Sequence, residues 1–214
     1  MPEKAPARSP SAEWAAPAGA AIGSGTGTDM AIEIVLFDLG GVLIELSPLQ
    51  SMGRFFAEPN EEAVWQRWLG CPWVRRFERG HCAPDEFARG MVESWSMTAP
   101  PEAFLEAFVR WPKGLLPGAR ELALTVRSQV AIGCLSNTNP LHAARHESEE
   151  AVYDLFDHRF LSHELGLVKP DREIYDHVVG RLGCPAERVL FLDDNQINVD
   201  GARAALARHG FPIP

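Results

Sequence analysis

The stretch "IEIVLFDLGGVL", residues Ile32–Leu43, decides the fold. It opens with a short apolar run that contains β-branched side chains, and this run ends at Asp38 and the glycine pair Gly40–Gly41. An unbroken apolar run of this length is typical of a central strand that is buried on both faces. We therefore expect the first strand of a parallel sheet here, with Asp38 at the carboxyl edge, where such sheets form their sites.

Three later segments repeat this pattern of an apolar run followed by polar groups. They are Val130–Asn137, Arg159–Ser162 and Arg188–Asn195. Stretches with helical periodicity lie between the strands, at residues 119–128, 174–182 and 199–209. Strands that alternate with helices predict an α/β fold, in which a doubly wound parallel sheet carries helices on both faces.

Residues 49–113 have a different pattern, because they contain helical stretches rich in Trp, Phe, Glu and Arg and no convincing strand. We predict an all-α, four-helix-like cap over the crevice, inserted between two parts of the core, residues 30–48 and 114–214. The aromatic residues recur at helical spacing and are predicted to form the core of the cap itself: Trp65, Trp68, Phe87, Trp95, Phe104 and Phe108. Residues 1–29, mostly Ala, Pro, Gly, Ser and Thr, are predicted to be a disordered tail, and Met30 is a second candidate start.

Composition excludes several classes of function. Twenty Lys and Arg against 29 Asp and Glu give a net charge of −9, which argues against a general nucleic-acid or anionic-membrane binder. No uninterrupted apolar run approaches the roughly 20 residues that span a bilayer. The four cysteines lack zinc-ligand spacing, so we interpret them as thiols of a reducing cytosol and predict a cytoplasmic protein. Nothing in the sequence indicates an oligomeric state.

Polar groups follow four successive elements of the predicted core: Asp38, Ser136, Lys169 in "LGLVKPD", and the pair Asp193–Asp194. Asp and Lys are costly to bury unless they are paired or bound to a metal. Their delivery to one edge of the sheet therefore predicts a site. A carboxylate, a hydroxyl, a cation and twin carboxylates suit the transfer of a phosphoryl group, which needs an in-line nucleophile and compensation of charge.

Asp38 is the predicted nucleophile, which would form an aspartyl-phosphate intermediate. A hard divalent cation, Mg²⁺ above all, takes oxygen ligands and keeps several waters. Asp38 and Asp194 can supply carboxylates to it, and the carbonyl of Gly40 can supply a third oxygen. Asp193 is predicted either to bind the cation as a further ligand or to contact one of the residues that bind it.

The remaining polar groups are predicted to hold the phosphoryl group and the carboxylates. Ser136 and the backbone amide of Asn137 can donate hydrogen bonds to phosphoryl oxygens. Lys169 is predicted to offset the negative charge and to hold the carboxylates apart electrostatically. Asn198 is predicted to orient one of the carboxylates.

The motifs "FDLGGVL", "LSNTN", "VKPD" and "FLDDNQIN" stand in the order found in the haloacid dehalogenase (HAD) superfamily, which the chain resembles over residues 32 to about 211. The resemblance is to the branch with a helical cap after the first motif. It implies a Rossmann-like core, Mg²⁺-dependent phosphatase activity, and a cap that selects the substrate. "LSNTN" with His142 beyond it is similar to bacterial members that act on sugar phosphates such as glucose 1-phosphate, which implies a small phosphorylated metabolite as partner.

One position departs from the family pattern. HAD phosphatases usually carry a second Asp two residues after the nucleophile, which protonates the leaving oxygen, and here that position is Gly40. Turnover would then favour leaving groups that need little protonation, or another group, His142 or a cap residue, would donate the proton. A catalytically weak or non-enzymatic binding or regulatory protein is the third reading.

Two other classes fit the motifs less well. A haloacid dehalogenase uses the same Asp to attack carbon, but it needs no metal and its last motif typically lacks twin carboxylates. In a bacterial receiver domain the acidic pair precedes the nucleophile, whereas here Asp193–Asp194 comes last. A metal-dependent phosphatase is the better interpretation.

Three further segments are given structural rather than catalytic interpretations. The arginines of "WVRRFERG", Trp73–Gly80, are predicted to be solvated or to form local ion pairs. His142–Glu150 is predicted to be an exposed helical face. Cys134, inside an apolar strand, is predicted to be an inert buried thiol.

Overall fold

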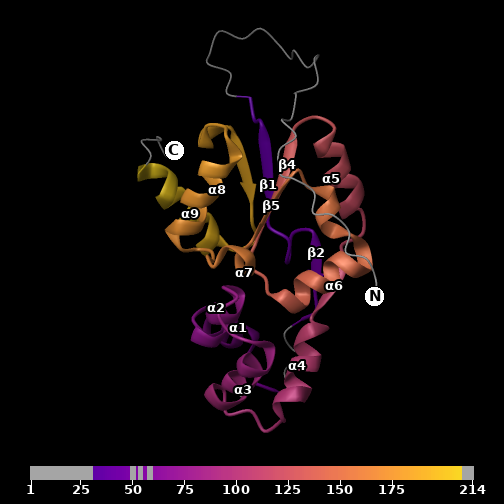
Figure 1. Cartoon of the computed structure of the whole chain (residues 1–214), viewed down its shortest axis with the longest axis vertical. Helices are drawn as coiled ribbons and strands as arrows, with labels where there is room; N and C mark the ends of the chain where they lie inside the picture. Colours follow the sequence, from indigo (N-terminus) through magenta and orange to yellow (C-terminus); the bar gives the residue numbers. More distant parts are fainter. Residues whose placement is uncertain (1–30, 49–51, 53–54, 57–59, 209–214) are drawn as a thin grey trace, which may run out of the picture.

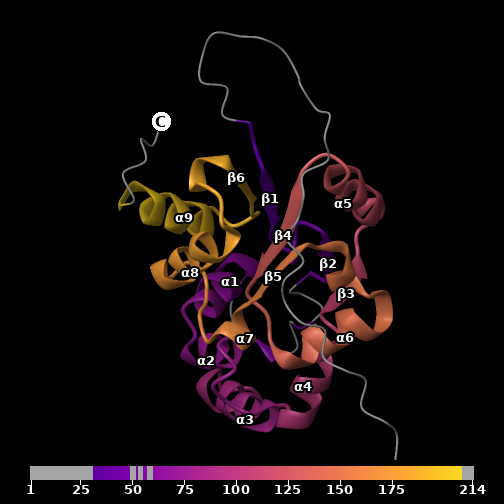
Figure 2. The ribbon, with the colours of Figure 1, turned by 45° about the horizontal axis from the view of Figure 1, so that its top comes forward.

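The computed structural model describes residues 31–48, 52, 55–56 and 60–208, so the predicted tail of residues 1–29 lies outside the described residues. A four-stranded parallel sheet forms the centre of the larger part of the molecule, and a group of helices lies beyond one end of it (Figures 1 and 2). Among the described residues, no helix is long and apolar enough to cross a membrane.

The sheet has the strand order β5-β4-β1-β6. Its strands are β1 (Ile34–Phe37), β4 (Ala131–Ser136), β5 (His158–Leu161) and β6 (Val189–Leu192). The helices of this core are α5 (Ala119–Arg127), α6 (Pro140–Glu150), α7 (Ser162–Leu165), α8 (Arg172–Leu182) and α9 (Gln196–Arg208), with short 3-10 turns at Val152–Leu155 and Ala186–Arg188. Because β1 pairs with β4 on one side and β6 on the other, the chain changes direction across the sheet at β1.

Successive side chains of β1 point to opposite faces of the sheet, and both faces are covered. Val35 and Phe37 pack in one apolar cluster with residues of α5, while Ile34 and Leu36 pack in another with residues of α8 and α9. Figure 1 shows these helices on the two sides of the sheet. The α/β, Rossmann-like fold class predicted from the alternation of strands and helices is confirmed.

Strand β6 differs from the prediction that each apolar run is buried on both faces. Leu190 is 43% exposed and Leu192 is 37% exposed. β6 has a single strand neighbour among the described residues, and α8 and α9 cover the face to which Val189 and Phe191 point. The expectation of full burial is therefore wrong for this strand, because the face to which Leu190 and Leu192 point stays partly open.

Four α-helices lie between β2 (Ile44–Leu46) and β3 (Pro112–Leu115), in the part of that segment that the structure describes. They are α1 (Glu61–Leu69), α2 (Pro72–Glu78), α3 (Pro84–Ser94) and α4 (Pro101–Val109). Each of the last three begins with proline, whose fixed φ and missing N–H suit the first position of a helix. We keep the predicted division, a cap of residues 49–113 within a core of 30–48 and 114–214, as a proposal.

The strands β2 and β3 form a small antiparallel sheet that joins the cap segment to the core. The sequence analysis found no strand in this region, although β3 begins at Pro112. The pair was missed because a proline and a glycine interrupt β3, so that the local pattern has no alternation to detect. Its pairing partner is β2, more than sixty positions earlier in the chain.

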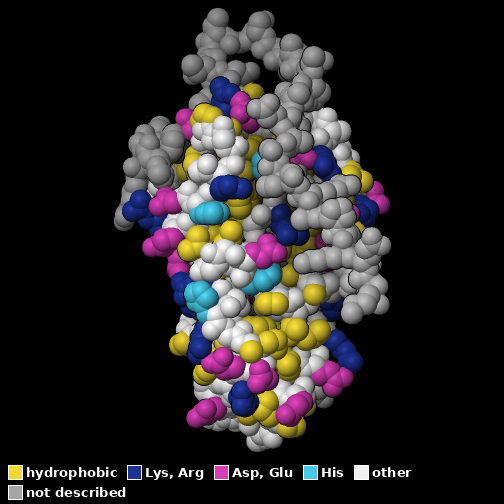
Figure 3. Space-filling view, in the orientation of Figure 1, with side chains coloured by type: hydrophobic (Ala, Val, Ile, Leu, Met, Phe, Trp, Pro, Cys, Tyr) yellow, Lys and Arg dark blue, Asp and Glu magenta, His cyan; other side chains and the backbone are white. Residues whose placement is uncertain are grey.

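The aromatic residues of the cap pack against one another, as predicted. The rings of Phe77 and Phe87 are stacked with centroids 4.3 Å apart, and Phe104 and Phe108 lie against Phe87. Trp68 contacts Phe108 at 5.9 Å between centroids. On the face shown in Figure 3, charged side chains are scattered around hydrophobic ones over this region. Burial of aromatic area is thus the main force that holds the four helices together.

Phe87 has no exposed surface, so its truncation tests this packing. Phe87→Ala is expected to lower the free energy of unfolding by about 3–5 kcal/mol, because it removes buried ring contacts and leaves a cavity. Leu122→Ala in α5, where the side chain is 51% exposed, is the control and is expected to change stability by less than about 0.5 kcal/mol. Urea denaturation followed by fluorescence and circular dichroism measures both, and equal effects would contradict the assignment.

Candidate active site

Three neighbouring strands deliver polar side chains to one edge of the sheet. Asp38 directly follows β1, Ser136 is the last residue of β4, and Asp193 and Asp194 directly follow β6. Lys169 comes from the loop between α7 and α8. The structure therefore brings together the polar groups that the sequence analysis placed at this edge.

Lys169 lies at the centre of this group, with 2% of its surface exposed. Its Nζ is 2.9 Å from Oδ1 of Asp38 and 2.5 Å from Oδ2 of Asp193. Burial would lower the pKa of Lys169, but the two carboxylates outweigh it and raise that pKa above its usual value. Lys169 is therefore a buried ammonium that bridges the ends of β1 and β6.

The side chain of Asn137 fastens the backbone of Lys169. Its Nδ2 donates a hydrogen bond to the carbonyl of Lys169 at 2.9 Å, and its Oδ1 accepts one from the amide of Lys169 at 2.8 Å. The sequence analysis gave Asn137 a role for its backbone amide alone. The paired hydrogen bonds were missed because they join positions 32 apart in the chain.

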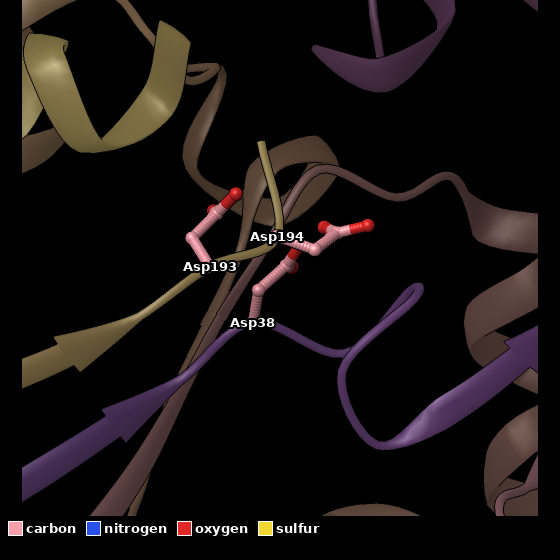
Figure 4. Close-up of side chains that lie close together, drawn as sticks. All are labelled: Asp38, Asp193 and Asp194. Carbon is pink, nitrogen blue, oxygen red and sulfur yellow. The ribbon is translucent and has the colours of Figure 1, made fainter. Parts of the chain in front are cut away.

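A third carboxylate lies near the two that pair with the ammonium, because Asp38, Asp193 and Asp194 each have an oxygen within 4.8 Å of the others. Figure 4 shows that Asp193 and Asp194 leave the end of β6 in different directions. Both oxygens of Asp193 are engaged, by Lys169 and by the amide groups of Asn195 and Asn198. Asp193, held by Asn198, thus pairs with Lys169, while Asp38 pairs with Lys169 and also lines the cavity together with Asp194.

The electrostatics of this cluster favour a cation. Burial raises the pKa of Asp38 to about 6, although Lys169 opposes the shift and Asp193 adds to it. Burial and the neighbouring Asp193 also raise the pKa of Asp194. One ammonium does not compensate three carboxylates. The all-oxygen donor set that faces the cavity fits a hard divalent ion such as Mg²⁺.

The two glycines after β1 differ in what they permit. Gly41 has φ +79°, and a Cβ on it would lie 2.2 Å from Oδ2 of Asp194, so glycine is required there. A Cβ on Gly40 would meet Leu46 at an ordinary 3.5 Å. Steric crowding of a Cβ therefore does not explain why the second acid of the family is absent.

A cavity of about 450 Å³ separates the edge of the sheet from the cap helices. Its floor includes Asp38, Gly40, Ser136, Lys169 and Asp194, together with Asn137 and Asn198. Side chains of α1, α2 and α4 line its roof, among them Trp65, Leu69, Val74, Glu78 and Phe108. The cap helices thus contribute a wall to the cavity that holds the predicted site residues.

His142 lines the same cavity but is held in place by both ring nitrogens. Nε2 is 2.8 Å from the carbonyl oxygen of Phe108, and Nδ1 is 3.0 Å from Nδ2 of Asn139. Burial lowers the pKa of His142 to about 4, so the neutral ring donates from Nε2 to Phe108 and accepts at Nδ1. This arrangement disfavours His142 as the substitute proton donor.

The segment His142–Glu150 is not the wholly exposed face that its charge pattern predicts. His142, Ala143 and His146 are buried in α6, while Glu147, Ser148 and Glu149 are exposed. The prediction was wrong for the buried side because histidine and alanine carry little apolar signal. Cys134, by contrast, is buried as predicted, and burial raises the pKa of its thiol to about 12.

The arginines of α2 form ion pairs, but two of these are not local. Nη2 of Arg75 lies 2.6 Å from Oδ1 of Asp171, and Arg79 also pairs with Asp171, which lies in the core. Arg76 pairs with Glu86 of α3 at 2.9 Å. Neither Asp171, which stands where a helix N-terminus is expected, nor Glu78 could be recognised as a functional residue from the local sequence.

The chain matches the family described as "haloacid dehalogenase-like hydrolase" over residues 32–205. It belongs to this family. The match spans the four motifs as well as the cap helices, so the resemblance seen in the motifs is confirmed over most of the chain. The chain is therefore assigned to a family of hydrolases.

Three relatives illustrate the similarity. The sesquiterpene phosphatase astK of Aspergillus oryzae is 30% identical over 175 residues, which cover 79% of this chain and 84% of the relative. The D-ribitol-5-phosphate phosphatase of Bacteroides thetaiotaomicron is 23% identical over 78% of this chain and 85% of its own. A HAD family enzyme of the same bacterium, solved in complex with magnesium and inorganic phosphate, has a TM-score of 0.65 and 26% identity, and the match covers 82% of this chain and 91% of that one.

Replacement of Lys169 tests its place in the cluster. Lys169→Met is expected to lower the free energy of unfolding by about 3–5 kcal/mol at pH 7, because it leaves the buried carboxylates of Asp38 and Asp193 without a compensating positive charge. The loss should be smaller at pH 5, where a carboxyl with a raised pKa takes up a proton and loses its charge. Chemical denaturation at both pH values measures this.

Lys113→Met is the matched control, because Lys113 is exposed and pairs with Glu45 at the surface. Its effect is expected to stay within about 1 kcal/mol at either pH. A Lys169→Met protein as stable as the unmodified chain at pH 7 would contradict the bridging role.

Proposed function

We propose that this protein is a Mg²⁺-dependent phosphatase that releases inorganic phosphate from a small phosphorylated metabolite through an aspartyl-phosphate intermediate. The observation that carries the proposal is the cluster in which Asp38, Asp193 and Asp194 have oxygens within 4.8 Å of one another beside Lys169. The phosphatases among the relatives support it.

In the proposed reaction the carboxylate of Asp38 attacks phosphorus, and the bond from phosphorus to the alcohol oxygen breaks. Ser136 and the amide of Asn137 line the cavity beside Asp38 and would donate hydrogen bonds to the phosphoryl oxygens. Lys169 holds Oδ1 of Asp38 and so orients the nucleophile. Water then hydrolyses the aspartyl phosphate and restores Asp38.

Asp38, Asp194 and the carbonyl of Gly40 would hold Mg²⁺, because all three residues line the cavity and offer oxygen. When bound, the ion supplies positive charge that compensates the phosphoryl oxygens and the carboxylates. Asp193 and Asn198 support the site indirectly. The side chain of Asn198 donates a hydrogen bond to Asp193, and Asp193 accepts one from the ammonium of Lys169.

Asp38→Asn tests the nucleophile. It is expected to lower phosphate release at least about 10³-fold, since the amide cannot form the phosphoenzyme. Release is measured with the best substrate from a panel of phosphorylated metabolites, with Mg²⁺ and with EDTA. Asp154→Asn, at an exposed position in the turn Val152–Leu155, is the matched control and is expected to leave the activity unchanged.

The alternative of a binding protein without turnover follows from Gly40 and makes a different prediction. In that case the folded, unmodified protein releases no phosphate from any member of the panel, with or without Mg²⁺. Activity that Asp38→Asn retains would instead contradict the assignment of the nucleophile.

The roof of the cavity supports a second candidate for the substrate class. The sequence resemblance suggests sugar phosphates, and D-ribitol-5-phosphate phosphatase is one of the relatives. The wall formed by Trp65, Leu69, Val74 and Phe108 is apolar, however, and would suit the body of an apolar alcohol better than a sugar. The similarity to a sesquiterpene phosphatase supports this second candidate, a terpenyl monophosphate.

Trp65→Ala distinguishes the two candidates. If the alcohol is apolar, kcat/KM for a sesquiterpenyl monophosphate is expected to fall about 30-fold, because an aromatic contact of roughly 2 kcal/mol is lost. Glucose 1-phosphate and ribitol 5-phosphate should be affected much less. Faster cleavage of the sugar phosphates by the unmodified protein would contradict the apolar candidate and support the sugar class.

A further inference from the structure

The proposed reaction leaves one chemical need unmet on the floor of the cavity, which is a proton for the departing alcohol oxygen. Gly40 stands where the family usually places that acid, and Lys169 is fully engaged by two carboxylates. Both ring nitrogens of His142 are also engaged. His146 also lines the cavity, but burial lowers the pKa of its ring, so the neutral imidazole carries no acidic proton of use here. A donor is therefore expected on the opposite wall, which the cap helices form.

Two ionisable residues reach this wall from the cap, among those that the structure describes: Arg75 and Glu78, both on α2. Arg75 pairs with Asp171, and a guanidinium does not give up its proton in proteins. We propose that Glu78 is the general acid of this enzyme, which protonates the leaving oxygen in place of the missing acid at position 40. The inference rests on the proposed phosphatase function and names a catalytic residue for it.

The position of α2 against the core is fixed by contacts on either side of Glu78. Arg75 and Arg79, three residues before and one residue after Glu78, both pair with Asp171. Asp171 stands two residues after Lys169, so the loop that carries the ammonium of the floor also anchors the helix of the roof.

A second contact holds the end of α2. Gly80 has φ +69°, and a Cβ on it would lie 2.5 Å from the carbonyl oxygen of His163 in α7. Only glycine allows the cap and the core to approach so closely at this point. Glu78 is therefore set on a helix end that is tied to the core rather than on a free surface of the cap.

The surroundings of Glu78 suit a proton donor. Its carboxyl is half-buried and forms neither a hydrogen bond nor an ion pair with the described residues. Burial raises the pKa of Glu78 to about 7, although Lys169 and Arg75 oppose the shift and Asp38 adds to it. A pKa near the working pH gives an acid that is both protonated and able to release its proton.

The protons balance over the two half-reactions. When Asp38 attacks phosphorus, the electron pair of the broken P–O bond stays on the alcohol oxygen, which takes the proton of Glu78. Glu78 is then a carboxylate. When water attacks the aspartyl phosphate, that carboxylate takes a proton from the water, so Glu78 becomes acidic again and Asp38 is released.

Glu78→Gln tests the proposal, because glutamine keeps the shape of the side chain but has no acidic proton. The test compares two aromatic monoesters of similar size, p-nitrophenyl phosphate and 2-phenylethyl phosphate. The nitrophenolate leaves without protonation, whereas the alkoxide of phenylethanol needs a proton. We expect kcat/KM to fall about 10²–10⁴-fold for 2-phenylethyl phosphate but less than about fivefold for p-nitrophenyl phosphate.

Two further variants sharpen the test. Glu93→Gln, at an exposed position of α3, makes the same change of charge on the cap and is expected to alter neither ester. Gly40→Asp, for which a Cβ has room, should raise 2-phenylethyl phosphate cleavage at least about tenfold in the Glu78→Gln background. This gain should exceed the gain from the same substitution in the unmodified protein.

The outcomes separate this proposal from the one on which it rests. A selective loss with the alkyl ester, recovered by Gly40→Asp, supports Glu78 as the acid. Equal losses with both esters, or no loss with either, overturn that role while leaving the phosphatase intact. A folded, unmodified protein that cleaves neither these esters nor any phosphorylated metabolite of the panel in the presence of Mg²⁺ overturns both proposals.

Discussion

The buried ammonium of Lys169 is the interaction on which the rest of the structure depends. Asp38 and Asp193 end adjacent parallel strands, so the fold forces two carboxylates together in a place with little water. Their repulsion would oppose the pairing of β1 with β6 unless a cation stood between them. Lys169 supplies that charge, and Asn137 fixes its backbone so that the ammonium stays in position.

The same loop connects the chemistry of the floor with the cap. Lys169 reaches down to the carboxylates, while Asp171 reaches across to Arg75 and Arg79 of α2. A group on α2 is therefore positioned by the same loop that holds Asp38, the proposed nucleophile. The side chains of these ion pairs are partly exposed, so each pair by itself contributes little to stability.

Several features could be predicted from the sequence because their signal is local. An apolar run followed by Asp38, and another followed by Asp193 and Asp194, mark strand ends wherever they stand in a chain. Parallel strands bring such ends to one edge, so the gathering of these carboxylates follows from the α/β pattern alone. The proposed identity of the nucleophile and of the metal ligands comes from the same pattern together with the family motifs.

Other features were missed because each depends on a partner far away in the sequence. Three contacts join distant segments of the chain: the pairing of β2 with β3, the hydrogen bond between His142 and the carbonyl of Phe108, and the ion pair between Arg75 and Asp171. In the sequence, Glu78 stands among arginines and resembles an ordinary solvated charge. Its half-buried place on the cavity wall follows from the docking of α2, which no local pattern encodes.

By itself, the order of apolar runs, helices and terminal acids determined the fold class, the edge that bears the site and the kind of chemistry that its residues suit. Only the tertiary structure decided that Asp38 and Asp193 both hold the lysine, that Asp38 and Asp194 line the cavity, and that Glu78 of the cap lines the same cavity. The physical reason is the distance along the chain over which each kind of signal acts. Periodicity and strand-end chemistry act between neighbours in the chain, whereas burial, ion pairing and cavity shape are set by segments that meet after folding.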